Sequence, residues 1–216
     1  MTVSLALVDY IPVILFAATS VLLMRDLYNK MSKGAFALMS AGLIMVIWAG
    51  AYKATWKLFY TMNIADLYLM NNVLLPMQAA GFLILGIGLI AATFFNQGKG
   101  KSYVSALPVL MLIATQAPKQ ERAAVVFIIF MVLGYLGFCG CLTVIAARMK
   151  KIPAVVLFVL SFVLLMGMGY LGSREFGNDP KMNWIEEGVN LCAQLCLLSG
   201  VLILHKSGLK ERADLK

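Results

Sequence analysis

Residues 186 to 194 hold the group of side chains with the clearest potential for chemistry. Glu187, Asn190 and Gln194 follow one another at spacings of three and four, and Glu186 stands four residues before Asn190. On a helix, these spacings place either carboxylate at the head of a single stripe of polar side chains. Such a carboxylate would bind a cationic group or a proton, and the amides would orient a polar ligand by hydrogen bonds.

Further polar groups are expected at the same level of the molecule. Asn71 and Gln78 lie seven residues apart, which is about two helical turns, so they share a helix face. Lys53 and Arg174 would supply cations for an anionic group. These side chains predict an outward-opening pocket that binds a small polar or charged solute.

Aromatic side chains follow the helix that carries Lys53, and they are expected to form one wall of this pocket. They are Trp48, Tyr52, Trp56 and Phe59. The complete set of predicted ligand-binding residues is Glu186, Glu187, Asn190, Gln194, Asn71, Gln78, Lys53, Arg174, Trp56 and Tyr52. No catalytic residue and no metal ligand is predicted.

A structural role is the alternative for each of these groups. Charges near a helix end can be solvated or can reach the water interface along their own side chains. Tryptophan and tyrosine form interfacial belts, and amides hold membrane helices together. The cysteines do not have the spacing of a redox or zinc motif and are expected to act as small hydrophobic residues; they are Cys139, Cys141, Cys192 and Cys196.

The elements that must position these groups are membrane-spanning helices. Of 216 residues, 62% are hydrophobic and only 13% are charged, which is more apolar surface than one soluble core can bury. A spanning helix needs about 20 mostly apolar residues. Seven segments meet this requirement, at 5–24, 34–55, 68–95, 102–118, 123–147, 152–173 and 184–205. The fourth is the weakest, because Pro108 interrupts it.

Basic residues set the predicted orientation of this all-α, seven-helix bundle. Twelve of the 18 lysines and arginines fall on one side of the predicted helices and six on the other. The richer side is cytoplasmic by the positive-inside rule, which places the N-terminus outside and the C-terminus in the cytoplasm. Residues 1–216 would then form a single transmembrane domain in the cell membrane, and residues 206–216 a short basic tail.

Polar groups and basic residues recur at matching places in helices one to three and five to seven. Arg25 and Arg148 end the first helix of each triplet, and each third helix carries the pair of polar groups seven residues apart. This pattern predicts a 3+1+3 plan with parallel repeats, an arrangement that also occurs in SWEET transporters.

Several function classes do not fit the sequence. A retinal protein needs a lysine in the middle of the seventh helix, where Lys206 stands only at the end. The single histidine, His205, leaves no axial pair for haem and no histidine cluster for zinc. No cofactor and no nucleic-acid partner is therefore predicted, and an enzyme using Glu187 as a general base ranks third.

Two functions remain in the analysis of the sequence. The first is transport of a small solute, which suits the repeats and the polar pocket. The alternative is a sensor that binds an extracellular ligand and signals to a cytoplasmic partner, because the polar residues stop about half way through the membrane. The expected partners are the lipid bilayer, the solute, and either a cytoplasmic protein or a second copy of the chain.

Overall fold

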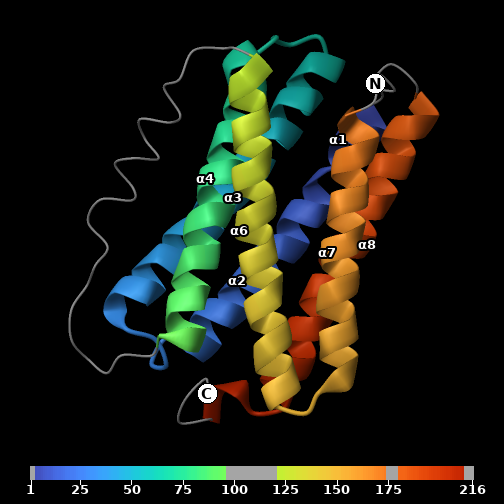
Figure 1. Ribbon diagram of the computed structural model, residues 1–216. Helices are drawn as coiled ribbons and strands as arrows, with labels where there is room; N and C mark the ends of the chain where they lie inside the picture. Colours follow the sequence, from blue (N-terminus) through green and yellow to red (C-terminus); the bar gives the residue numbers. More distant parts are fainter. Residues whose placement is uncertain (1–2, 96–120, 174–179, 212–216) are drawn as a thin grey trace.

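The computed structural model describes residues 3–95, 121–173 and 180–211, and these parts of the chain are helical (Figure 1). Six of the described helical stretches are long and apolar enough to cross a membrane. The helices are α1 (Val3–Val8), α2 (Tyr10–Leu27), α3 (Lys33–Thr61), α4 (Tyr68–Phe94), α6 (Glu121–Arg148), α7 (Ile152–Ser173) and α8 (Pro180–Lys206). A short 3₁₀ turn, η2 (Leu209–Glu211), follows α8. The predicted helix over 102–118 lies outside the described residues.

Local sequence signals account for the ends of α3. The Ser32 side chain accepts a hydrogen bond from the Ala35 backbone N–H at 3.3 Å, which caps the first turn. At the other end, Asn63 adopts a positive φ of 55°, and the Ile64 N–H bonds back to the Phe59 carbonyl. The helix therefore runs to Thr61 rather than to residue 55 as predicted, and the additional turns include Lys57.

A one-residue interruption at Asp9 divides the first predicted segment into two helices, and Val3–Leu27 together remain one candidate membrane span. Pro12 lacks a backbone N–H, and its ring crowds the carbonyl four residues earlier, at Val8. Helix α1 accordingly ends at Val8 and α2 begins at Tyr10. Asp9 thus lies at the junction of the two helices, and its side chain is buried.

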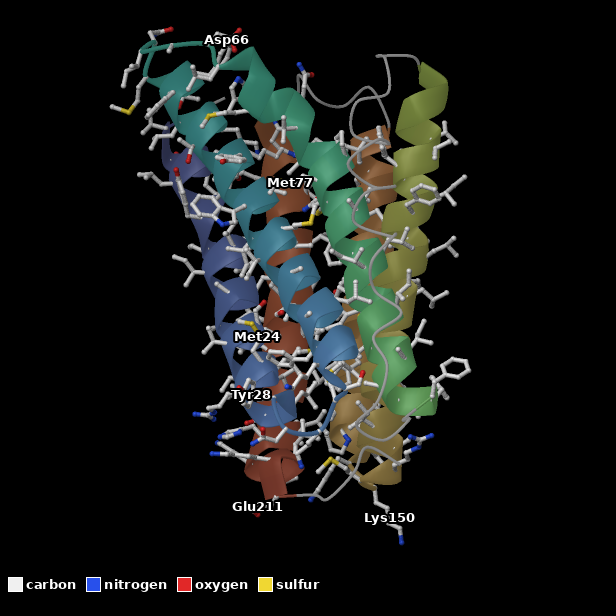
Figure 2. The ribbon with its side chains drawn as sticks, turned by 90° about the vertical axis from the view of Figure 1, so that its left-hand side faces the viewer. Met24, Tyr28, Asp66, Met77, Lys150 and Glu211 are labelled. Atoms are coloured by element: carbon white, nitrogen blue, oxygen red, sulfur yellow. The ribbon has the colours of Figure 1, made fainter. Side chains whose placement is uncertain are left out.

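The described helices form a closed ring. Helix α2 packs against α3, α3 against α4, α4 against α6, α6 against α7, α7 against α8, and α8 returns to α2. Figure 1 shows the chain starting at one end of this bundle and finishing at the other. Figure 2 likewise shows Asp66 at one end, with Lys150 and Glu211 at the opposite end.

Neighbouring helices α4 and α6 run in the same direction. Midway along both helices, Gly134 of α6 lies against the backbone of Phe82 in α4. Late in both helices, Arg148 donates a hydrogen bond to the Thr93 carbonyl at 3.3 Å. Because both helices run from the same end to the other, α4 ends and α6 begins at opposite ends of the bundle.

Glycines bring three helices into backbone contact. A Cβ atom on Gly42 of α3 would lie 2.5 Å from the Gly81 carbonyl oxygen of α4, and one on Gly86 of α4 would lie 2.6 Å from the Gly134 carbonyl oxygen of α6. Small residues permit such close approach between membrane helices, where lipid removes most of the hydrophobic drive for association. Helices α3, α4 and α6 are therefore the most closely packed part of the ring.

We expect Gly134→Ala to destabilise the protein by about 1–3 kcal/mol, because its new methyl group would overlap the backbone around Phe82. Gly140→Ala is the matched control on the same helix, since its methyl group meets nothing within 4 Å. That variant should stay within about 0.5 kcal/mol of the wild type. Thermal unfolding in detergent measures both, and equal midpoints for the two variants would contradict the close contact between α4 and α6.

Five aromatic side chains meet inside the ring and form what we name the central aromatic cluster. Its ring pairs lie 5.1 to 6.5 Å apart between centroids, and most cross edge to face or are tilted. The members are Phe16, Phe82, Tyr135, Phe138 and Phe162. The Tyr135 hydroxyl also bonds to the Ser161 hydroxyl at 2.8 Å, and Ser161 donates to the Ala193 carbonyl at 2.9 Å. The cluster therefore links α2, α4, α6, α7 and α8.

The end of the described chain folds back on the bundle. Gly208 adopts a φ of 78°, a left-handed conformation that turns the chain after α8. Leu209 is then fully buried, and η2 contacts both α2 and α8. The part of the predicted tail that the structure describes is thus anchored by one apolar residue.

Candidate functional site

A lysine and two carboxylates meet where α3, α8 and the junction of α1 with α2 come together. The Lys57 ammonium contacts one oxygen of Asp9 and lies 3.2 Å from Oε1 of Glu187. The side chains of Asp9, Lys57 and Glu187 are only 6%, 9% and 14% exposed. We call these three residues the Lys57 cluster.

The Lys57 cluster holds more negative than positive charge. Two carboxylates face one ammonium group, and the second oxygen of each, Oδ1 of Asp9 and Oε2 of Glu187, has no hydrogen-bond partner. Both carboxyl groups contact the same ammonium group, so they lie close to each other. Buried oxygens of this kind are costly without a donor, so the cluster is suited to receive one.

Two more charged residues surround the cluster. Lys53 lies one helical turn before Lys57 and is within electrostatic range of Asp9, Glu186 and Glu187. Three carboxylates and two ammonium groups leave one excess negative charge. Lys53 is intermediate in exposure as a residue, whereas Lys57 is buried.

A polar contact next to the cluster fixes the junction of α1 and α2. Thr55 donates its hydroxyl hydrogen to the Ala51 carbonyl at 2.8 Å. The Tyr10 hydroxyl lies 2.8 Å from the Thr55 oxygen and is the remaining donor for that contact. The bond holds the start of α2 against α3 and so keeps Asp9 beside Lys57.

The predicted polar stripe on α8 leads from the cluster toward the centre of the bundle. Gln194 lies two turns beyond Glu187 on the same face, is 6% exposed, and its Oε1 has no hydrogen-bond partner. Asn190 lies between them and is half-buried. Ala193, next to Gln194, accepts the Ser161 hydrogen bond, so the stripe reaches the level of the central aromatic cluster.

The structure places the other predicted ligand-binding residues apart from this group. Tyr52 contacts Trp48, which is 52% exposed. Trp56 donates to Asp66 at 2.9 Å and stacks on Tyr60. Tyr52 and Lys57 are five positions apart, which places them on largely opposite sides of α3.

The remaining predicted residues are not joined to the cluster by any described contact. Gln78 is half-buried on α4. The side chain of Asn71 and all of Arg174 lie outside the described residues. Their assignment to the ligand site stays a prediction.

Two members of the cluster were not among the predicted ligand-binding residues. In the sequence, Asp9 and Lys57 stand near helix ends, where they resemble solvated charges. The signal that could have selected them is a lone aspartate three residues before a proline, together with two lysines spaced four apart. The spacing places both lysines on one face of the helix, but it does not predict which acidic residues they contact.

A second polar group joins the same helices at the other end. His205 Nδ1 of α8 lies 2.8 Å from an oxygen of Asp26 in α2, and Arg25 lies 2.8 Å from His205 Nε2. The two contact sites show that α2 and α8 run parallel, with Asp9 near Glu187 and Asp26 near His205. Phe16 stands between them, seven residues after Asp9 and ten before Asp26. The central aromatic cluster therefore separates the two polar groups.

The fold and this arrangement define a helical bundle of the multi-pass membrane type, with six described apolar helices. Among the residues that the structure describes, no three histidine, cysteine, aspartate or glutamate side chains are grouped to hold a metal ion. No known protein family, curated protein or solved structure matches the chain.

Proposed function

We propose that this protein crosses the membrane seven times and transports a small polar or charged solute, which binds at the Lys57 cluster. The observation that carries the proposal is a buried ammonium shared by two carboxylates that each keep one oxygen without a donor. Ionisable groups inside a membrane bundle are costly and mark the paths of solutes and ions.

The direction of the described helices supports an odd number of crossings. Helix α2 lies parallel to α8, and α4 lies parallel to α6. Figure 1 shows that all four helices run in one direction. The end of α4 and the start of α6 lie at opposite ends of the bundle, which supports the proposed seventh crossing of the chain. The basic residues Arg25, Lys150 and Lys206 lie together at one end, which supports a cytoplasmic assignment for that end.

The order of helices in the ring supports two parallel repeats. The triplet α2, α3, α4 is followed around the ring by α6, α7, α8, which is the order that two parallel repeats related by a half turn would give. The middle helix of each triplet runs opposite to its two neighbours. Transporters with such repeats bind their solutes where the repeats meet, and the contact of α2 with α8 is such a place.

The chemistry of the site favours a solute with a positive charge. A primary amine could donate to Oδ1 of Asp9 and Oε2 of Glu187 at once, and it would cancel the excess negative charge. Charge-assisted hydrogen bonds of this kind are about twice as strong as neutral ones. Lys53 is available for an anionic group on the same solute, which includes amino acids among the candidates.

Passage beyond the site requires a rearrangement of the helices. The central aromatic cluster fills the interior next to Gln194, and the described core beyond it is mostly leucine, isoleucine and valine. The arrangement fits a transporter closed on its cytoplasmic side, with the aromatic rings as the closed gate.

The test begins with thermal unfolding of the purified protein against amines, amino acids, sugars, nucleosides and lipids, because a bound ligand stabilises the folded state. Any compound that raises the midpoint is then followed, as a radiolabelled probe, into sealed proteoliposomes. Loss of one charge-assisted bond of about 2 kcal/mol predicts roughly 30-fold weaker uptake at low solute in Glu187→Gln.

Glu211→Gln is the matched control, because Glu211 lies at the opposite end of the bundle. It should transport as the wild type does. Unchanged uptake in Glu187→Gln, with the control also unchanged, would remove the Lys57 cluster from the transport path.

The same central aromatic cluster supports a second candidate, a membrane sensor that binds its ligand on the outer side. Rings that remain closed would allow ligand binding but no passage. A compound that stabilises the wild type through Glu187 and yet shows no flux in vesicles would select the sensor over the transporter.

A further inference from the structure

We propose that Asp9 and Glu187 share one exchangeable proton, and that a cationic solute displaces this proton when it binds. The coupling of proton to solute rests on the proposed transport function. The proton site itself rests only on the described side chains.

The geometry of the Lys57 cluster brings the two carboxyl groups together. Both contact the same nitrogen atom of Lys57, which places them side by side. Each presents one buried oxygen without a hydrogen-bond donor, Oδ1 on Asp9 and Oε2 on Glu187. A single proton between these oxygens would give one of them a donor and the other an acceptor, so both would be satisfied.

Charge balance favours holding this proton. Asp9, Glu187 and Lys57 together carry one net negative charge. The nearby Lys53 and Glu186 have opposite charges and do not change this net charge. One bound proton makes the whole group neutral. Neutrality matters in a site this buried, because an uncompensated charge away from water is strongly unfavourable. Two carboxyl groups that share a dry site hold one proton in the same way.

A proton fits this site better than a metal cation does. Alkali and alkaline-earth ions need several oxygen ligands, whereas the cluster offers two unoccupied carboxylate oxygens beside an ammonium group. The Lys57 charge repels a metal ion at the position where it would have to bind both carboxylates. A proton needs only one carboxyl oxygen to bind to and a second to accept its hydrogen bond.

The charged and polar groups around the site come from each helix packed against it. Helix α3 contributes Lys53, Lys57 and Thr55, and the start of α2 contributes Tyr10. Helix α8 contributes Glu186 together with the amides described above. Among these side chains, Asp9 and Glu187 are the carboxyl groups that contact Lys57, so the proton is assigned to that pair.

The consequence is a one-for-one exchange. Binding of a cationic solute to the two oxygens requires the carboxyl proton to leave to water, and return of the proton releases the solute. Charge in the site stays constant through the exchange. This mechanism is proton–cation antiport, which an inward proton gradient would drive in the direction of solute export.

Infrared difference spectroscopy measures the proton directly and needs no solute. The purified protein in lipid is cycled between acidic and alkaline buffer, and the carbonyl stretching band of a protonated, buried carboxyl group is followed. We expect one such band in the wild type, and its loss in both Asp9→Asn and Glu187→Gln. Glu186→Gln and Asp26→Asn are controls that remove neighbouring or equally buried carboxyl groups and should keep the band.

Either of two results would overturn the proton site. One is a wild-type spectrum in which no band of a buried carboxyl group changes with pH. This result needs no variant, so it does not depend on whether a variant folds. The other is a band that survives both Asp9→Asn and Glu187→Gln in protein that unfolds at the wild-type midpoint.

Flux in proteoliposomes then separates the site from its function. The probe is the amine or amino acid that stabilises the protein, and the expected result is stimulation by an imposed pH gradient. A carboxyl band without flux of any probe retains the proton site and overturns the transport function. Flux that ignores the pH gradient, with the band present, retains transport and overturns the coupling.

Discussion

Replacing Lys57 with methionine is expected to destabilise the protein by about 3–5 kcal/mol at mildly alkaline pH, the largest single effect we predict. The substitution preserves the length of the side chain but removes the ammonium that both Asp9 and Glu187 contact. Two buried carboxylates would then face each other without a counterion. Unfolding in detergent, followed by the loss of helical circular dichroism, measures the change.

The loss of stability in Lys57→Met should diminish as the pH falls. Protonation of the two carboxyl groups removes the repulsion that the missing ammonium no longer offsets. Lys53→Met is the matched control, because Lys53 lies one turn away on the same helix and, unlike Lys57, forms no ion pair with Asp9 or Glu187 among the described residues. Equal stability of the two methionine variants at every pH would contradict the central position of Lys57.

Replacing Phe16 with alanine is expected to have the second largest effect, a loss of about 2–3 kcal/mol. Phe16 is 4% exposed, and its ring meets Phe82 at 6.0 Å and Phe138 at 6.5 Å between centroids. Lipid is itself apolar, so most of the loss comes from the cavity and the lost ring contacts rather than from transfer to water. Thermal unfolding measures the change.

The same variant tests whether the central aromatic cluster closes the path through the bundle. Opening a cavity at Phe16 should raise passive leakage of a transported probe from loaded vesicles. Phe95→Ala is the control, because Phe95 is 66% exposed at the end of α4 and touches none of the five rings. A stable Phe16→Ala protein with no increase in leakage would argue that the closed gate lies elsewhere.

The apolar segments of the sequence predicted most of the described helices. The segments 123–147 and 152–173 agree with α6 and α7 to within two residues at each end. The prediction works because a spanning helix must satisfy its backbone hydrogen bonds internally, so a long apolar run has no other stable form in lipid. The segment 34–55 was too short, since Lys53, Trp56 and Lys57 lower the apolar character of turns that are helical all the same.

The candidate site was predicted in part. Spacing alone was enough to place Glu187, Asn190 and Gln194 on one face of α8, because a regular helix converts sequence intervals into directions. Spacing says nothing about which other helix that face meets. The side chains of Tyr52 and Trp56, which were predicted to line the pocket, therefore lie on a different side of α3 from Lys57.

Composition, apolar periodicity and local signals by themselves determined that this protein is a bundle of membrane-spanning helices. This property depends on whether each segment is more stable in lipid or in water. That preference follows from the segment's own residues and does not depend on its neighbours. The tertiary structure alone decided that Asp9, Lys57 and Glu187 share one buried site. Their contact joins residues 48 and 130 positions apart, and it depends on the break before Pro12 and on the packing of α2 between α3 and α8.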